Sequence, residues 1–197
     1  MSKRVVVLPT GTANLASVLA AFTRLGAKTE IAADAVAVAE AERAVLPGVG
    51  AFGAAMAGLR EAGLDQAIAA RVRAGAPTFA MCVGLQVLFE ASDESPDQAG
   101  LGVLPGRVGR FPEGVRVPQF GWNRIEPEPG CRYLEPGFAY FANSYCVRAA
   151  PGCKTARAEH GEPFVAALEQ GHVVACQFHP ELSGAFGHAL LARWLAS

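Results

Sequence analysis

A cysteine, a histidine and a glutamate in two distant segments have the residue types and local spacing of a thiol-based acyl-transfer site. Cys82 follows the apolar stretch 77–81 and precedes the run 83–89, which predicts the start of a helix. A nucleophile at a tight strand-to-helix turn needs small residues two positions to either side, and Ala80 and Gly84 meet this need. A helix N-terminus also favours the thiolate, the reactive form of cysteine. This segment predicts a nucleophile, although a buried structural cysteine fits it almost equally well.

The second segment contains His179, Pro180 and Glu181. Proline keeps the preceding residue out of the helical region, so His179 is predicted to be extended. Residues two apart in an extended chain point the same way, which lets Glu181 reach the imidazole. The carboxylate would fix the tautomer and stabilise the imidazolium once the thiol proton is taken. A loop histidine beside a solvated glutamate is the alternative for these three residues alone.

Acyl transfer also needs donors for the oxyanion that develops on the attacked carbonyl group. The segment 47–50, Pro-Gly-Val-Gly, follows a predicted strand, and its two glycines allow backbone N–H groups to turn toward a ligand. Glycine-rich loops between strands and helices are common, so this signal is weak by itself.

The elements that must position these groups alternate between strand and helix in the first half of the chain. Buried-type strands are predicted at 5–8, 28–31, 43–46 and 77–81. Asn14 can cap a helix that ends at Gly26, and further helical stretches lie near 53–60 and 64–74. Such alternation predicts a parallel sheet covered on both faces, with the ligand crevice at the carboxyl ends of the strands, where Cys82 falls.

The second half has a different character. The segment 93–136 is rich in glycine and proline, and strand-like runs follow at 138–147, 154–159, 164–169 and 172–176, with a hairpin turn at 169–172. A closing helix places Phe186, Leu190 and Trp194 one turn apart. We therefore expect an α/β fold with an antiparallel β addition, built as a single domain over residues 1–197.

Composition excludes several classes of protein. The chain is 51% hydrophobic and 18% charged with a net charge of −1, so it is globular and has no basic run for nucleic acid. No apolar run reaches the roughly 18 residues of a membrane span, and we expect a cytoplasmic protein. The cysteines and histidines show no zinc-ligand spacing, and a disulfide framework is not expected. We expect the four cysteines other than Cys82 to be structural: Cys131, Cys146, Cys153 and Cys176.

At this point the chain resembles the class I, triad-type glutamine amidotransferases, whose elbow usually reads Gly-x-Cys-x-Gly followed by a glutamine. Here that segment is 80–86, with Ala80 in place of the first glycine. More narrowly, the chain is similar to the glutaminase subunits of imidazole glycerol phosphate synthase. The segments that carry this similarity include 46–52, 117–123 with Gly-Trp-Asn, and 177–181. The resemblance implies a flavodoxin-like three-layer fold and covers nearly the whole chain.

The resemblance also implies roles for individual residues. Cys82 would attack the glutamine side-chain amide, His179 would act as general base and then acid, and Glu181 would orient it. No metal or cofactor is implied. The remaining implied site residues are the oxyanion donors Gly48, Val49, Gly50 and Val83, and the groups that hold the amino-acid end of glutamine, Gln86, Glu94, Ser144 and Tyr145. Glu94 is equally well read as a solvated acid.

By the same resemblance, the ammonia would pass to a separate cyclase subunit, a (β/α)₈ barrel, in a heterodimer. The residues that would face it are Asn14, Gln119, Trp122 and Leu182. Gln119 and Asn143 stand where histidine is common, and Leu182 replaces a usual lysine. Two alternatives stay open: an amidotransferase for another synthase, such as that of pyridoxal phosphate biosynthesis, and a regulatory partner that does not turn over glutamine.

Overall fold

The computed structural model describes residues 3–11 and 14–197, and within them nine strands form one mixed sheet. Its order is β2-β1-β3-β4-β12-β11-β10-β7-β8, and a smaller sheet has the order β5-β6-β9. In the large sheet β2, β1, β3, β4 and β12 run parallel, and the pairings from β12 to β8 are antiparallel. The fold is of the predicted α/β class, and the antiparallel strands lie in the predicted second half.

The strands have the following bounds: β1 Arg4–Val7, β2 Lys28–Ile31, β3 Arg43–Leu46, β4 Thr78–Met81, β5 Phe89–Ser92, β6 Leu104–Arg110, β7 Gln119–Pro127, β8 Gly137–Asn143, β9 Tyr145–Val147, β10 Lys154–Glu159, β11 Pro163–Gln170 and β12 Val173–Cys176. The helices are α1 Leu15–Arg24, α2 Ala35–Glu40, α3 Phe52–Glu61, α4 Asp65–Arg73, α5 Val83–Gln86 and α6 Gly184–Ala196, with a 3₁₀ turn, η1, at Pro180–Leu182.

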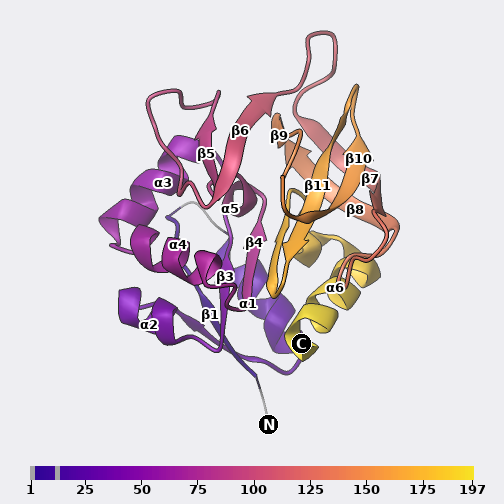
Figure 1. Cartoon of the computed structure of the whole chain (residues 1–197). Coiled ribbons are helices and arrows are strands. Elements are labelled where there is room, and N and C mark those ends of the chain that lie inside the picture. Colours follow the sequence, from indigo (N-terminus) through magenta and orange to yellow (C-terminus); the bar gives the residue numbers. More distant parts are fainter. Residues whose placement is uncertain (1–2, 12–13) are drawn as a thin grey trace.

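Helices cover the two faces of the parallel strands, as Figure 1 shows with α2, α3 and α4 on one side and α1 and α6 on the other. Successive residues of a strand point to opposite faces, so β1, β3, β4, β11 and β12 each supply residues to both hydrophobic clusters. In β1, Val6 packs into the cluster beneath α3 and α4, whereas Val5 and Val7 pack with Phe22 and Trp194. Burial of both strand faces explains the continuous apolar runs of the sequence.

The structure corrects several of the boundaries expected from the sequence. The predicted run 138–147 is divided at Ser144 between β8 and β9, which belong to different sheets. The helix predicted after Cys82 ends at Gln86, because the chain turns and re-enters a strand at Phe89. The helix α2 was not predicted: Asp34 caps it by accepting from the Ala37 N–H at 2.8 Å. The hairpin between β11 and β12 is confirmed.

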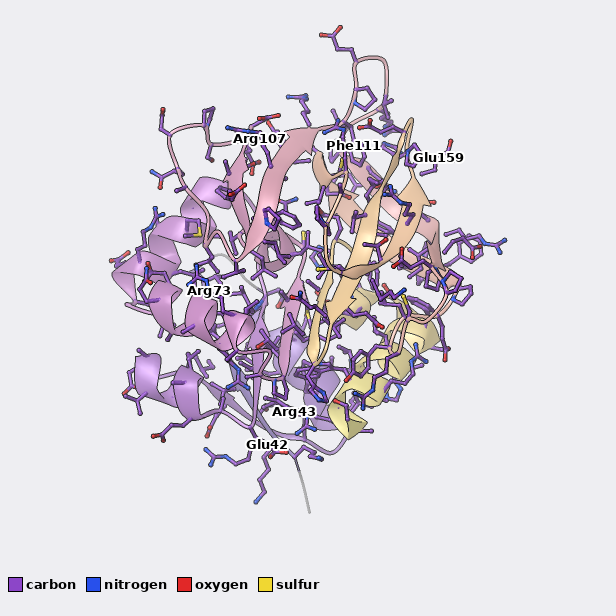
Figure 2. All side chains as sticks on the ribbon, in the orientation of Figure 1. Glu42, Arg43, Arg73, Arg107, Phe111 and Glu159 are labelled. Atoms are coloured by element: carbon purple, nitrogen blue, oxygen red, sulfur yellow. The ribbon has the colours of Figure 1, made fainter. Side chains whose placement is uncertain are left out.

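The amino ends of the parallel strands, on the side of the sheet away from Cys82, contact the C-terminal end of the chain. Arg43 at the start of β3 is 3% exposed, ion-pairs with Glu42 and donates to the carbonyl oxygen of Ser197. Figure 2 labels Arg43 and Glu42 near this end of the molecule. The contact holds the last turn of α6 against the sheet, far from the carboxyl ends of the strands.

Candidate active site

Cys82 lies in the tight turn between β4 and α5, with φ 53° and ψ −112°. It is the one non-glycine residue with a positive φ in the described part of the chain. Such a conformation is uncommon for an L-residue and costs energy, which surrounding structure must supply. Its N–H donates to the Cys176 carbonyl at 2.7 Å, so the neighbouring strand β12 holds the turn. The expected strand-turn-helix elbow is therefore present.

Glycine is needed where the elbow meets the loop after β3. A Cβ added to Gly84 would lie 2.0 Å from the Leu46 carbonyl oxygen, and one added to Gly48 would lie 2.9 Å from the Gly84 nitrogen. Both distances are too short for real atoms, so the two backbones touch directly. Ala80, at the position where a glycine is usual, is fully buried within β4. The close approach brings the segment 47–50 against the nucleophile.

His179 follows β12 and faces the elbow from the neighbouring parallel strand. Its backbone is extended, with φ −101° and ψ 96°, as the following proline predicts. Its Nδ1 lies 2.9 Å from Oε1 of Glu181, and the two side chains are 7% and 5% exposed. The two-residue spacing thus brings the Glu181 carboxylate to Nδ1 of the imidazole, and Nε2 is left to interact with the thiol of Cys82.

The protonation of His179 follows from this burial and these neighbours. Burial by itself lowers the pKa of His179, but hydrogen bonds and charge interactions with Cys82 and Glu181 outweigh burial and raise that pKa to about 10. The imidazolium is therefore favoured at neutral pH beside a sulfur atom that can carry the matching negative charge. This is the electrostatic arrangement of an activated thiol.

A cavity of about 500 Å³ opens over the nucleophile. It brings together residues at or after the ends of β3, β4, β5, β6, β8 and β12. Most of the predicted site residues line this cavity: Val49, Gly50, Cys82, Val83, Gln86, Glu94, Ser144, Tyr145 and His179. Four further lining residues were not assigned to the site from the sequence: Ala51, Pro118, Ala142 and Asn143. Of the remaining predictions, Gly48 lies behind the elbow and Glu181 lies behind the imidazole.

Glu94 has a defined position in this cavity wall. Its carboxylate accepts from the Phe52 N–H at 2.7 Å, and the next residue, Ser95, accepts from the Gly53 N–H at 3.1 Å. Helix α3 has no side-chain cap from its own N-cap residue, Ala51, so a distant loop satisfies its first amides. Glu94 is therefore a half-buried group at the cavity and not only a solvated acid.

The oxyanion donors are close to the thiol, but one of them is engaged. The Val83 N–H donates to the Gly48 carbonyl at 3.3 Å. Gly50 has φ +83°, a conformation that glycine adopts freely. The Val83 N–H can therefore donate to an oxyanion only after it has given up its hydrogen bond to the Gly48 carbonyl.

Gln177 was not assigned a role from the sequence, yet its side chain touches the nucleophile. Its Nε2 donates to Cys82 Sγ at 3.7 Å, and its Oε1 accepts from Gln86 Nε2 at 2.9 Å. The signal was present in the spacing: Gln177 stands two residues before His179 in extended chain, so both side chains point to the same side. The nucleophile thus has two polar neighbours from one strand end.

The residues predicted to face a partner differ in their exposure. Trp122 and Leu182 are 57% and 49% exposed, and Phe120, which was not predicted, is 71% exposed. Asn14 caps α1 by accepting from the Ser17 N–H at 3.3 Å. Gln119 is buried and lines a separate cavity of about 370 Å³ with Phe120 and Trp122.

No group of three metal-ligating side chains occurs among residues 3–11 and 14–197. The helices that the structure describes include none long and apolar enough to cross a membrane. Cys131, Cys146, Cys153 and Cys176 are free thiols, and burial raises the pKa of each.

Comparisons with known proteins agree over almost the full length. Residues 7–196 match the model of the glutamine amidotransferase class-I family. The chain is 44% identical to the imidazole glycerol phosphate synthase subunit HisH of Mycobacterium leprae, with 98% of each covered. It is 39% identical to the subunit of that name from Symbiobacterium thermophilum, covering 97% of this chain and 92% of the relative.

Solved structures show the same fold. A crystal structure of a glutamine amidotransferase superposes with a TM-score of 0.76 at 25% identity, covering 97% of this chain and 96% of the other. PurLQS from Thermotoga maritima superposes with a TM-score of 0.73 at 18% identity, covering 100% and 99%, and this likeness concerns the fold alone. With the thiol elbow and the paired histidine already in place, these matches show that the chain belongs to the class I glutamine amidotransferases and, within them, to the family of imidazole glycerol phosphate synthase HisH subunits.

Proposed function

We propose that this chain is the cytoplasmic glutaminase subunit of imidazole glycerol phosphate synthase, acting as one domain that releases ammonia from glutamine at Cys82. The observation that carries the proposal is the strained Cys82 turn facing the buried His179–Glu181 pair, whose Nδ1–Oε1 distance is 2.9 Å. Membership of the HisH family supports the pathway, histidine biosynthesis.

The geometry supports a two-step acyl transfer. The Cys82 proton moves to His179, Sγ attacks the amide carbon, and the imidazolium returns a proton to the leaving nitrogen, which departs as ammonia. A water then attacks the glutamyl thioester with His179 as base, and glutamate leaves as the thiol is restored. Glu181 keeps the imidazole in the required tautomer throughout.

The amino-acid end of glutamine would bind at the opposite wall of the cavity. The carboxylate of Glu94 and the amide oxygen of Gln86 suit an α-ammonium, and backbone N–H groups at Ser144 and Tyr145 suit an α-carboxylate. The Glu94 carboxylate also holds the first amide of α3, so substrate contacts there are on a fixed element.

The oxyanion loop explains an expected dependence on a partner. Because the Val83 N–H is bonded to the Gly48 carbonyl, that carbonyl must move away before the Val83 amide can donate to the oxyanion. We expect weak glutaminase activity for the isolated subunit, and higher activity when a ligand-loaded cyclase is docked. Equal turnover with and without the loaded cyclase would contradict this coupling.

We propose that the cyclase, a (β/α)₈ barrel, docks on the outer face of β7 and β8 to form a heterodimer. Phe120 and Trp122 are exposed on one side of β7, and Phe138 on β8 and Leu182 are exposed as well. Large exposed apolar side chains grouped in this way mark interaction surfaces. Asn14, at the start of α1, and the buried Gln119 are the other two residues that we expect to be near the cyclase.

The decisive experiment compares Cys82→Ala with the parent chain in the complex with its cyclase. Glutamine-dependent synthase activity should vanish, whereas activity with added ammonium salt should stay unchanged. Unchanged glutamine-dependent activity would support a regulatory subunit without turnover. Recovery of a pyridoxal phosphate synthase in place of the cyclase, in a pull-down with the tagged chain, would favour the other alternative.

A further inference from the structure

The side-chain amides next to Cys82 form a chain whose direction is fixed by a backbone group. The Tyr145 carbonyl can only accept hydrogen bonds. Gln86 Nε2 lies 3.2 Å from that oxygen and 2.9 Å from Gln177 Oε1. The Gln86 amide must therefore present its nitrogen to both acceptors. The Gln177 amide must then present its oxygen to Gln86 and its nitrogen to Cys82.

The last link of this chain reaches the reacting atom. Gln177 Nε2 lies 3.7 Å from Cys82 Sγ, within hydrogen-bond distance for sulfur. Oxygen and nitrogen of an amide are normally assigned from their neighbours, and here a carbonyl two links away makes the assignment. The nucleophile therefore faces an N–H donor, and not an amide oxygen.

Gln177 is held rigidly in this position. The residue is fully buried, and its backbone N–H donates to the Ala166 carbonyl at 2.8 Å. The pairing of Cys176 with Met81 in adjacent parallel strands puts Gln177 level with Cys82. A donor fixed by packing and by a second hydrogen bond acts on a developing charge without reorganising.

We propose that Gln177 is a catalytic residue that donates its side-chain N–H to the Cys82 thiolate, with Gln86 and the Tyr145 carbonyl as its positioning groups. This proposal rests on the proposed function of Cys82 as the nucleophile. A thiolate is a far better acceptor than a thiol, so the bond favours the ionised form. It favours the same form when sulfur leaves during hydrolysis of the thioester.

The same network limits what Gln86 can do for the substrate. Both hydrogens of its amide nitrogen are engaged by Gln177 and Tyr145. Its oxygen is then the only group free to meet a ligand in the cavity. Gln86 consequently serves as an acceptor for the α-ammonium of glutamine, and not as a donor to its carboxylate.

The test measures how fast iodoacetamide alkylates Cys82 across a range of pH, with mass spectrometry of the Cys82 peptide to separate it from the other thiols. In the full chain, Gln177→Met should move the pH at half-maximal rate upward by about 1 unit, the usual size of one hydrogen bond to a charged group. Gln177→Glu, which keeps the shape but places a carboxylate beside sulfur, should move it further. The control Gln66→Glu makes the same chemical change on an exposed face of α4 and should leave the profile unchanged.

A Gln177→Met profile that overlays the parent profile would overturn the proposal. If that variant does not fold, Gln86→Met is used instead, because it removes the amide that orients Gln177 and leaves Gln177 in place. It should shift the alkylation profile in the same direction by a smaller amount. A Gln86→Met profile without any shift would count against the proposal. Alkylation requires neither glutamine nor cyclase. A shifted profile in a chain without glutaminase activity would therefore refute only the proposed function.

Discussion

Gly84→Ala should abolish most of the activity while removing only part of the stability. The new methyl group would lie 2.0 Å from the Leu46 carbonyl oxygen, a backbone atom that cannot rotate away. The loop after β3 and the elbow must therefore separate by about 1 Å, a displacement that can cost about 10²-fold in rate when it moves catalytic groups. Overpacking of this kind costs about 1–3 kcal/mol of unfolding free energy.

The assay is glutamine-dependent turnover in the complex with the cyclase, paired with urea unfolding of the same preparation. Gly63→Ala is the matched control, because its φ of +67° makes alanine unfavourable while the added Cβ meets no atom within 4 Å. It should lose about 1 kcal/mol of unfolding free energy from the backbone strain alone and keep full turnover. Parental kcat/KM in Gly84→Ala would refute the argument that this contact sets the elbow.

Three further predictions concern buried charged groups. Burial lowers the pKa of His179 but the thiol and Glu181 raise it to about 10, so ¹⁵N NMR should show a ring that stays protonated through neutral pH and titrates only as pH rises towards 10. Glu181→Gln should move that titration downward; a native ring titrating near 6.5 would contradict the assignment. Glu169 is 5% exposed and accepts from three consecutive backbone amides, so Glu169→Ala should cost about 3 kcal/mol or more in urea unfolding. Arg71 donates to four backbone carbonyls. Arg71→Met should therefore lower the unfolding free energy, measured by urea denaturation, by about 2–4 kcal/mol and leave turnover of the folded enzyme unchanged.

The fold was predictable where local pattern and packing agree. The apolar runs of β1, β3 and β4 are buried on both faces, so composition alone identifies them. The segment of α2, Ala-Val-Ala-Val-Ala-Glu, alternates like a strand and becomes a helix under the Asp34 cap. The second sheet was not predictable, because its pairing of β6 with β9 joins segments far apart in sequence.

Some features of the candidate site were likewise predictable from local sequence, and others depend on contacts made only in the folded chain. Local spacing was enough for the tight turn at Cys82 and for the reach of Glu181 to His179, since turn and extended-chain geometry depend on adjacent residues. The donor role of Gln177 depends on a carbonyl at Tyr145, which only the folded chain brings near. Likewise, the engagement of the Val83 amide by Gly48 depends on contact between two separate loops.

The position of β12 in the large sheet has a consequence for how the enzyme is made. This strand comes almost last in the chain, yet it lies between β4 and β11. While a ribosome is still producing the chain, β4 is an unpaired edge, and such edges are prone to associate wrongly. Insertion of residues 173–176 closes that edge and in the same event delivers Gln177 and His179 to Cys82. A chain that lacks residues 173–179 therefore has no working nucleophile, and the site can form only after this strand has been made and inserted.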